Sequence, residues 1–323
     1  MNIEMIHSAA VRLQGKVRRT PLLSSPFLDE MAGRRVLVKP ECLQHTGSFK
    51  YRGGYSAISA MEEQKRKKGV LAYSSGNHAQ GVALAARQHN IPSAVIMPYD
   101  APAIKIANTK ALGAEVIGYD RVTEKREAIG EKLANERGLT LIKPYDEPEV
   151  IAGQGTTGIE IADQAKELGI SKADVLVCCG GGGLTSGIAL SLAEHAPEMT
   201  VYPAEPQDFD DTARSIVRGD HVFNKNTTGN ICDAILTPTP GELTFPILKR
   251  HCSKGFCVSE EEVLQTMVIA FQRLKLVIEP GGAVALATAL FRTEDLTGDT
   301  LIAVASGGNV DKEVFARALS EFN

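Results

Sequence analysis

The sequence lacks any long hydrophobic run. Its longest apolar stretches, near residues 175–179 and 283–290, have the length of a strand or a helix, whereas a membrane-spanning helix needs about 20 consecutive apolar residues. Residues 1–4 carry an acid and lack the basic-then-apolar order of a secretory signal. We therefore expect neither a membrane protein nor a secreted one.

Neither sign of charge dominates, because 35 basic and 39 acidic residues give a net charge of −4. Nucleic-acid binding calls for a basic surface, so nucleic acid is not an expected partner. The one basic cluster, residues 65–68, follows Glu62 and Glu63 and is typical of a solvated helix end.

The six cysteines include no CxxC pair. His251, Cys252 and Cys257 are close in sequence, but a tetrahedral zinc site needs four ligands and a second pair is missing. The cysteines are therefore interpreted as reduced, mostly buried thiols, which indicates a cytoplasmic location.

The 323 residues are enough for about two domains. No repeat of 20–50 residues is present; what recurs is a short apolar strand, a turn containing glycine and an amphipathic helix. The expected strands are 36–39, 70–73, 93–97, 115–119, 175–179, 200–204 and 301–305, with one long helix over 51–67. This alternation predicts an α/β fold whose parallel sheet is covered by helices and binds ligands at the carboxyl ends of its strands.

Lys50 stands between an aromatic residue and a glycine-rich turn, in Thr-Gly-Ser-Phe-Lys-Tyr-Arg-Gly-Gly at 46–54. A lysine in a partly dry pocket has a lowered pKa and can form a Schiff base with a carbonyl. Taken alone, a surface lysine in a loop is the commoner alternative.

Four consecutive glycines, 180–183, join the strand 175–179 to a helical stretch. Such a turn lets backbone N–H groups converge on an anion at the helix N-terminus. A tight packing turn would need fewer glycines. The dinucleotide pattern GxGxxG fails, because the next glycine is Gly187, although Glu205 lies near where a ribose-binding acid would stand.

Two further strand ends carry small polar groups. Residues 74–78, Ser-Ser-Gly-Asn-His, suit a carboxylate at a helix N-terminus, with simple capping by Ser75 or Asn77 as the alternative. Ser306, followed by two glycines, could meet the edge of a flat heterocycle. Together with Lys50 and the glycine turn, these features meet the needs of a pyridoxal phosphate enzyme acting on an amino acid.

The sequence resembles the fold-type II pyridoxal phosphate enzymes, and within them the branch of serine/threonine dehydratases and serine racemases, from about residue 15 to the C-terminus. The motifs that carry the resemblance lie at 48–53, 74–81, 152–156, 180–183, 204–206 and 306–309. The resemblance implies two open, mostly parallel sheets, with a large domain of residues 1–50 and 148–323 and a smaller inserted domain of residues 51–147.

The resemblance also implies residue roles. Lys50 would carry the cofactor, Phe49 would pack near its ring, Asn77 would bond its phenolic oxygen and Ser306 would meet its pyridine nitrogen. The phosphate would be held by Gly180, Gly181, Gly182 and Gly183. The substrate carboxylate would be bound by Ser74, Ser75, Gly76 and His78, and Ser75 matches the second acid/base of racemases.

A divalent cation site is implied by the same resemblance. Its ligands would be the carboxylates of Glu205 and Asp211 and the backbone carbonyl of Phe209. Hard oxygen ligands fit Mg²⁺, Ca²⁺ or Mn²⁺. Without the resemblance, a solvated acidic loop would be the preferred interpretation.

The predicted activity is elimination of water from a β-hydroxy amino acid (serine, threonine or 3-hydroxyaspartate), giving a 2-oxo acid and ammonia. A serine at the pyridine nitrogen supplies no counter-charge, which favours prompt loss of a β-leaving group over transamination. The nearest alternative is serine racemase; β-replacement and a binding module without catalysis are the others. A homodimer is expected from the family.

The substrate side chain is the least constrained feature. The chain has Cys232-Asp233-Ala234 where relatives commonly have Ala-Asp-Gly, and the segment 238–244 is also distinctive. The second carboxylate of 3-hydroxyaspartate would need a cation or N–H donors, and Arg52 and His45 are close to Lys50 in sequence.

Overall fold

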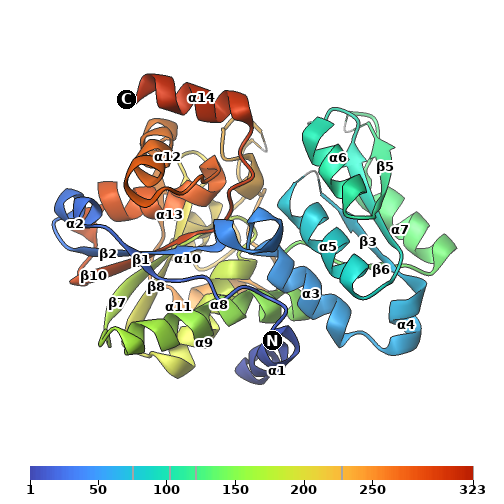
Figure 1. The fold of residues 1–323 in the computed structure, drawn as a ribbon, viewed down its shortest axis with the longest axis horizontal. Helices are drawn as coiled ribbons and strands as arrows, with labels where there is room; N and C mark the ends of the chain where they lie inside the picture. Colours follow the sequence, from blue (N-terminus) through green and yellow to red (C-terminus); the bar gives the residue numbers. More distant parts are fainter. Residues whose placement is uncertain (75, 102, 121, 227, 323) are drawn as a thin grey trace.

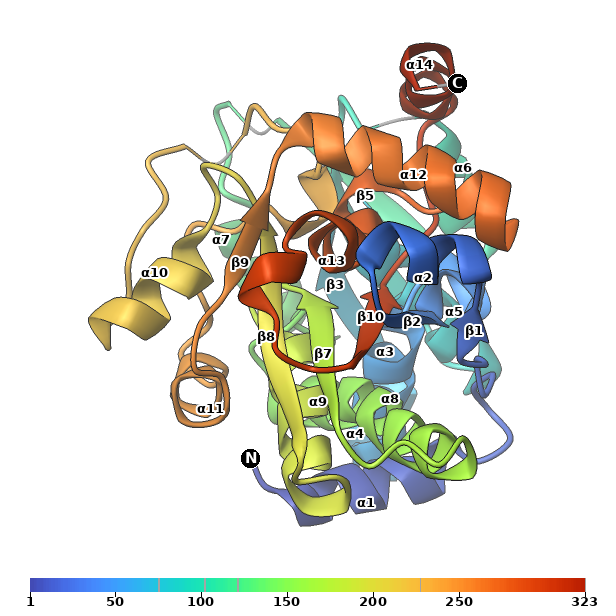
Figure 2. The same ribbon diagram turned by 90° about the vertical axis from the view of Figure 1, so that its left-hand side faces the viewer.

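The computed structural model describes residues 1–74, 76–101, 103–120, 122–226 and 228–322. Two sheets lie side by side, each accompanied by helices (Figures 1 and 2). The larger sheet has the strand order β1-β2-β10-β7-β8-β9 and the smaller sheet the order β5-β4-β3-β6. All strand pairs within these sheets are parallel except β1 with β2. The predicted α/β fold with two mostly parallel sheets is confirmed.

The strands of the larger sheet are β1 (Leu23–Ser24), β2 (Arg35–Pro40), β7 (Ala173–Cys178), β8 (Met199–Pro206), β9 (Phe256–Val258) and β10 (Thr300–Ala305). Those of the smaller sheet are β3 (Val70–Tyr73), β4 (Ser93–Pro98), β5 (Glu115–Tyr119) and β6 (Thr140–Leu141). The smaller sheet therefore falls inside residues 51–147. The exact limits of the inserted domain stay a prediction.

The helices are α1 (Ile3–Leu13), α2 (Pro26–Ala32), α3 (Lys50–Ala60), α4 (Glu63–Lys68), α5 (Asn77–Gln88), α6 (Ala103–Ala111), α7 (Arg126–Arg137), α8 (Pro148–Glu167), α9 (Gly183–His195), α10 (Asp211–Arg218), α11 (Phe245–His251), α12 (Glu260–Leu274), α13 (Pro280–Phe291) and α14 (Lys312–Glu321). Within the described ranges, none of them has both the length and the apolarity that crossing a bilayer requires.

The large sheet separates two apolar cores. Along β7, Leu176 and Cys178 face the core shared with α12 and α13, whereas Val175 and Val177 face the core shared with α8 and α9. Because successive side chains of a strand point to opposite faces, a strand covered on both sides must be apolar throughout. This explains why β7 is apolar from Val175 to Cys178 and β10 from Leu301 to Ala305, and why both strands are buried along their whole length.

The expected helix over 51–67 is wrong, because the chain breaks it into α3 and α4. Met61 ends α3 in an extended conformation (φ −66°, ψ 143°). Nearly all of α3 is buried, whereas α4 consists of polar residues only and is largely exposed. The break therefore lets the buried helix end and the chain return along the surface to β3.

Helices α8 and α9 approach closely behind the glycine turn. A Cβ on Gly187 would lie 2.6 Å from the backbone nitrogen of Gly155, and one on Gly158 would lie 2.7 Å from the Ser191 Cβ. Ser191 Oγ donates to the Gly155 carbonyl at 2.7 Å. These contacts fix α9, and with it the position of the glycine turn that precedes it.

Candidate active site

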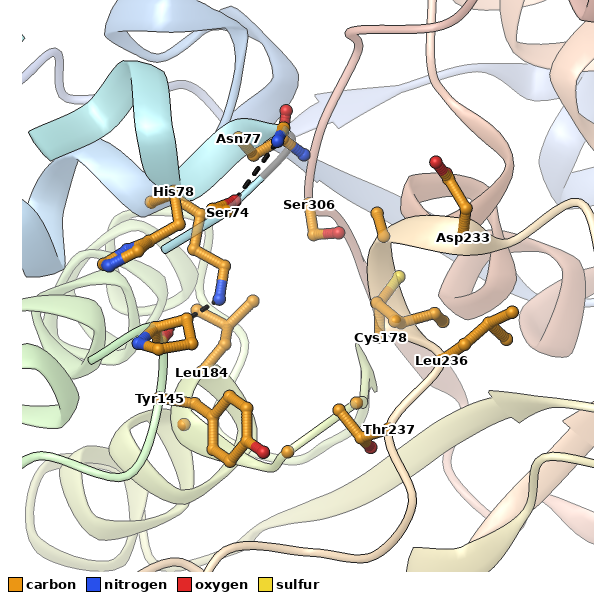
Figure 3. Close-up of a pocket in the computed structure, with 18 of the residues that line it drawn as sticks. Ser74, Asn77, His78, Tyr145, Cys178, Leu184, Asp233, Leu236, Thr237 and Ser306 are labelled. Atoms are coloured by element: carbon orange, nitrogen blue, oxygen red, sulfur yellow. Dashed lines mark hydrogen bonds between the residues drawn. The ribbon is translucent and has the colours of Figure 1, made fainter. Parts of the chain in front are cut away.

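A cavity of about 200 Å³ lies where the carboxyl ends of β3, β7 and β10 meet. Of the residues singled out in the sequence, the following line it: Phe49, Lys50, Ser74, Gly76, Asn77, His78, Gly180, Gly181, Gly182, Gly183 and Ser306. Ser75 lies outside the described residues. Glu205, Phe209 and Asp211 are not among the lining residues. Figure 3 shows Ser74, Asn77 and His78 along one side of this cavity, across from Cys178, Leu236 and Thr237.

Lys50 is the first residue of α3 and its amine is held inside the cavity. Its Nζ donates a hydrogen bond of 2.8 Å to the Pro144 carbonyl and lies 4.9 Å from the centre of the Phe49 ring. Burial lowers the pKa of Lys50 to about 8, although the nearby Glu279 opposes the shift. A much larger fraction of this amine is therefore neutral near pH 7 than of an exposed lysine, as nucleophilic attack on a carbonyl requires.

A buried ion network anchors the start of α3. The Arg52 guanidinium donates to Glu41 at 2.7 and 2.8 Å and to Glu160 at 2.7 and 3.0 Å, and Lys39 pairs with Glu160 at 2.6 Å. Burial raises the pKa of Glu41, but the adjacent Arg52 more than offsets this and leaves it lowered. Arg52 is thus fully occupied and is not among the residues that line the cavity; neither is His45.

The four glycines form a cradle that larger residues would block. Gly182 has φ +88°, and a Cβ on Gly180 would lie 2.9 Å from the Ile235 carbonyl oxygen. A Cβ on Gly181 would overlap the Tyr145 ring, and one on Gly183 would lie 2.6 Å from the Gln154 Oε1. The turn leads directly into α9, whose first N–H groups have no partner within the helix. It therefore offers donors to an anion such as a phosphate.

His78 is neutral in this environment. Burial lowers its pKa to about 3, with the nearby Lys50 adding to the effect, and its Nε2 lies 2.9 Å from the Ile142 carbonyl oxygen. Because a carbonyl only accepts, Nε2 carries the proton. His78 therefore adds no positive charge to the cavity, and a substrate carboxylate would depend on the N–H groups that open α5 and on the Ser74 hydroxyl.

Several polar residues of the cavity were not recognised as site residues in the sequence: Tyr73, Lys105, Arg126, Tyr145, Asp233 and Glu279. Asp233 stands in the Cys-Asp-Ala segment and Glu279 precedes Pro-Gly-Gly, so both stand in recognisable sequence patterns. Lys105 and Arg126 stand in separate helices, α6 and α7, and neither belongs to a local sequence motif. Only the fold brings these two cations to the cavity.

The predicted cation ligands form a separate buried cluster. Glu205 accepts the backbone N–H groups of Thr212 and Ala213 at 2.9 and 2.8 Å. Asp211 Oδ1 accepts from Asn224 at 2.6 Å, while its Oδ2 is buried without a partner among the described residues. Burial raises the pKa of Glu205 and raises that of Asp211 to about 7. In the described chain, no three His, Cys, Asp or Glu side chains gather in a way that could hold a metal ion.

A buried lysine beside a glycine cradle at the ends of parallel strands has the features that a pyridoxal phosphate site requires. The family of pyridoxal-phosphate dependent enzymes matches residues 13–307, and the chain belongs to this family. The residues present fit the cofactor, since the lysine is held in the cavity and the turn admits only glycine. The cofactor is thereby confirmed, as the resemblance implied.

Among known proteins, the chain is 42% identical to an L-threo-3-hydroxyaspartate ammonia-lyase from Pseudomonas sp, over 96% of both chains. It is 39% identical to a serine racemase from Schizosaccharomyces pombe, covering 98% of this chain and 96% of the relative. A solved structure, a threonine deaminase from T.th., superposes with a TM-score of 0.90 at 42% identity, covering 96% of this chain and 99% of the other. The prediction of a carbon–nitrogen lyase is confirmed.

Proposed function

We propose that the protein is an ammonia-lyase whose preferred substrate is L-threo-3-hydroxyaspartate. The enzyme removes water across the Cα–Cβ bond, and hydrolysis of the product returns that water and releases ammonia. The net products are a 2-oxo diacid and ammonia. The proposal is supported by the Pseudomonas relative of that name and by one feature of the cavity, its supply of positive charge.

Arg126 is the residue that we expect to select a substrate with a second carboxylate. In the part of the chain that the structure describes, three cations line the cavity, Lys50, Lys105 and Arg126. Lys105 is already balanced by Asp233 at 3.7 Å and Asp311 at 3.8 Å. Among the described residues, Arg126 forms an ion pair only with its exposed neighbour Glu127, through Nε.

The other nitrogens of Arg126 remain available to a ligand. The guanidinium lies 5.2 Å from the centre of the Tyr73 ring, which holds it against the wall beside β3. Arginine presents paired N–H donors that match a carboxylate. A second carboxylate on the substrate therefore finds a partner, whereas the side chains of serine and threonine carry nothing that needs one.

The remaining roles follow from position. Pyridoxal phosphate, when bound, supplies an electron-withdrawing ring that stabilises the charge left by removal of the α-proton. Lys50 would hold the cofactor and then take that proton. The N–H groups of the 180–183 turn would bind the phosphate, and Ser306 would face the ring nitrogen. Ser74 and the start of α5 would bind the α-carboxylate.

The test is a substrate panel with paired variants. Purified, cofactor-loaded protein is incubated with both 3-hydroxyaspartate diastereomers, L-serine, D-serine and L-threonine, and the oxo acid, ammonia and amino-acid enantiomers are quantified. Removing a charge-assisted contact in Arg126→Leu should raise KM for L-threo-3-hydroxyaspartate about 10- to 100-fold. Turnover of serine should change little.

Arg137→Leu is the matched control, because Arg137 ends the same helix α7 and pairs with Glu115 on the exposed surface. Equal losses on serine and on hydroxyaspartate in Arg126→Leu would contradict the proposed role of this residue. Conversion of L-serine mainly to D-serine would make the protein a serine racemase instead.

We also propose a divalent cation at Glu205, Asp211 and the Phe209 carbonyl. The support is the Asp211 Oδ2, a buried carboxylate oxygen without a partner among the described residues. Glu205 is a second buried carboxylate beside it, and burial disfavours the charged form of both groups. A hard cation such as Mg²⁺, Ca²⁺ or Mn²⁺ would neutralise both.

A homodimer in the cytoplasm completes the proposal. Large apolar side chains are exposed on the large-sheet part of the molecule, including Phe27 and Met31 of α2 and Phe271 of α12. All six cysteines are free thiols, five of them buried. Sedimentation of the purified protein measures the oligomeric state, and a monomer at micromolar concentration would contradict the dimer.

A further inference from the structure

The side-chain amide of Asn77, at the start of α5, is clamped between residues from distant parts of the chain. Its Nδ2 donates to Glu279 Oε1 at 2.5 Å, and its Oδ1 accepts from Asn309 Nδ2 at 2.7 Å. Asn309 Nδ2 also donates to the Thr46 carbonyl at 2.8 Å. Four residues from four segments thus form one chain of hydrogen bonds.

The Thr46 carbonyl sets the direction of this chain. A carbonyl oxygen only accepts, so the Asn309 group that faces it must be the NH₂. That NH₂ also faces Asn77, whose carbonyl oxygen must therefore be turned toward it. The NH₂ of Asn77 is left on the opposite side, where Glu279 accepts one of its two protons.

The surrounding glycines leave room for this arrangement. A Cβ on Gly307 would overlap Glu279 Oε1 and would lie 3.1 Å from the Asn77 Nδ2. A Cβ on Gly47 would lie 2.7 Å from the Asn309 Oδ1. Gly47 and Gly307 belong to the motifs at 46–54 and 306–309. The hydrogen-bonded chain around Asn77, and not a turn alone, therefore explains why glycine is needed at both positions.

Glu279 has no evident structural reason to be where it is. It is 5% exposed, and it precedes α13 without capping it through its side chain. Burying a carboxyl group costs stability unless it is paired. Its one side-chain hydrogen bond among the described residues is the one it accepts from Asn77.

The second N–H of Asn77 has no acceptor among the described residues, and Asn77 lines the cavity together with Ser306 and Lys50. Figure 3 shows Asn77 and Ser306 at the same end of the cavity. An amide held in this orientation can offer a proton to an oxygen anion in the cavity. The opposite orientation would offer a lone pair, which repels such an anion.

We propose that Glu279 is a positioning residue that, together with Asn309, fixes Asn77 as a hydrogen-bond donor to the phenolic oxygen of the cofactor. The inference rests on the proposed function only in so far as pyridoxal phosphate occupies the cavity. It does not depend on which amino acid the enzyme consumes, because its test needs no substrate.

The test measures binding of pyridoxal phosphate to stripped protein and the absorbance spectrum of the loaded protein at fixed pH. Glu279→Gln keeps an oxygen acceptor for Asn77, so its affinity and spectrum should stay within about twofold of the wild type. Glu279→Ala removes the acceptor and should weaken cofactor binding about tenfold, as expected for loss of a hydrogen bond to a charged group.

Asn309→Asp provides the second perturbation, because it replaces the NH₂ that faces Asn77 with an oxygen. The Asn77 amide should then turn over, and cofactor binding should weaken and the spectrum shift at least as much as in Glu279→Ala. Asp311→Asn is the matched control: it removes a nearby negative charge that Glu279 senses but leaves the four-residue chain intact, and its spectrum should be unchanged.

The positioning role is supported if Glu279→Gln keeps the cofactor affinity and spectrum of the wild type while Glu279→Ala and Asn309→Asp lose them. If Glu279→Gln is as impaired as Glu279→Ala, or if Glu279→Ala behaves like the wild type, the proposal is wrong. If Glu279→Ala does not fold, Glu279→Gln is compared with Asn309→Asp instead. Wild-type cofactor affinity in Glu279→Gln with weakened affinity in Asn309→Asp supports the proposal, and equal affinities in the two variants contradict it.

Discussion

The Lys50 amine donates a hydrogen bond of 2.8 Å to the carbonyl of Pro144, a residue 94 positions further along the chain. Lys50 opens α3, whereas Pro144 lies on the segment that leads from β6 back to α8. The bond therefore holds the free amine at the junction between the two sheets. The amine is in place before any aldehyde arrives, so little reorganisation is needed for attack.

The buried ion network behind α3 should be essential for stability. Glu41→Gln leaves the fully buried Arg52 with one carboxylate partner fewer, and breaking a buried pair typically costs about 3–5 kcal/mol. Chemical denaturation measures the free energy of unfolding. Glu167→Gln, which breaks the exposed pair with Arg19, is the control and should cost under about 1 kcal/mol. Equal effects of the two variants would contradict this account.

Replacing Gly180 by alanine should impair cofactor binding more than stability. The new Cβ would lie 2.9 Å from the Ile235 carbonyl oxygen and 3.1 Å from its Cα, so the cavity wall or the glycine turn must move. Titration of the stripped protein with pyridoxal phosphate gives the affinity. Gly130→Ala, within α7, meets only ordinary contacts of 3.5 Å or more and should leave that affinity unchanged.

Stability should depend on pH through Glu279. Burial raises the pKa of Glu279 from 4.5 to about 7, so the folded protein binds a proton that the unfolded chain releases. The Glu279 contribution is fully present below about pH 4.5, declines as the pH rises, and is lost above about pH 7. The melting temperature of the cofactor-free wild type should therefore fall relative to that of cofactor-free Glu279→Gln as the pH rises from about 5 to about 7. Parallel curves would contradict the prediction.

Removal of divalent cations should lower the melting temperature of the wild type. A ligand present at about 100 times its Kd stabilises the folded state by about 2.7 kcal/mol, and chelation would abolish that contribution. Asp211→Asn should be insensitive to chelation, whereas Asp210→Asn, which alters the partly buried pair with Arg214, should respond like the wild type. No shift in the wild type would remove the cation from the account.

The sequence predicts those parts of the fold and site that depend on local patterns. The strands β3 and β5 have the expected limits, and the 180–183 turn and Ser306 lie at strand ends, because apolar runs followed by glycines leave little choice of structure. The break at Met61 is not predicted, because the sequence pattern of α3 gives no sign of its end. It is imposed by the burial of α3 and the return of the chain to β3.

Long-range pairing accounts for the other differences. Arg52 is close to Lys50 in sequence, yet Glu41 and Glu160 hold it in the core, and no local pattern reveals partners from other elements. Arg126 and Lys105 reach the cavity from helices beside the small sheet for the same reason. Glu279 stands in a glycine-rich motif that the sequence does bring to attention, but its contact with Asn77 spans 202 residues and becomes visible only in the fold.

The most direct test of the account is to locate the lysine that carries the cofactor. Protein loaded with pyridoxal phosphate is reduced with borohydride, which fixes the linkage, then digested and examined by mass spectrometry. The account predicts that the added mass lies on the peptide containing Lys50 and disappears in Lys50→Ala. Attachment to any other lysine, or a loaded protein that carries no reducible linkage, would contradict it.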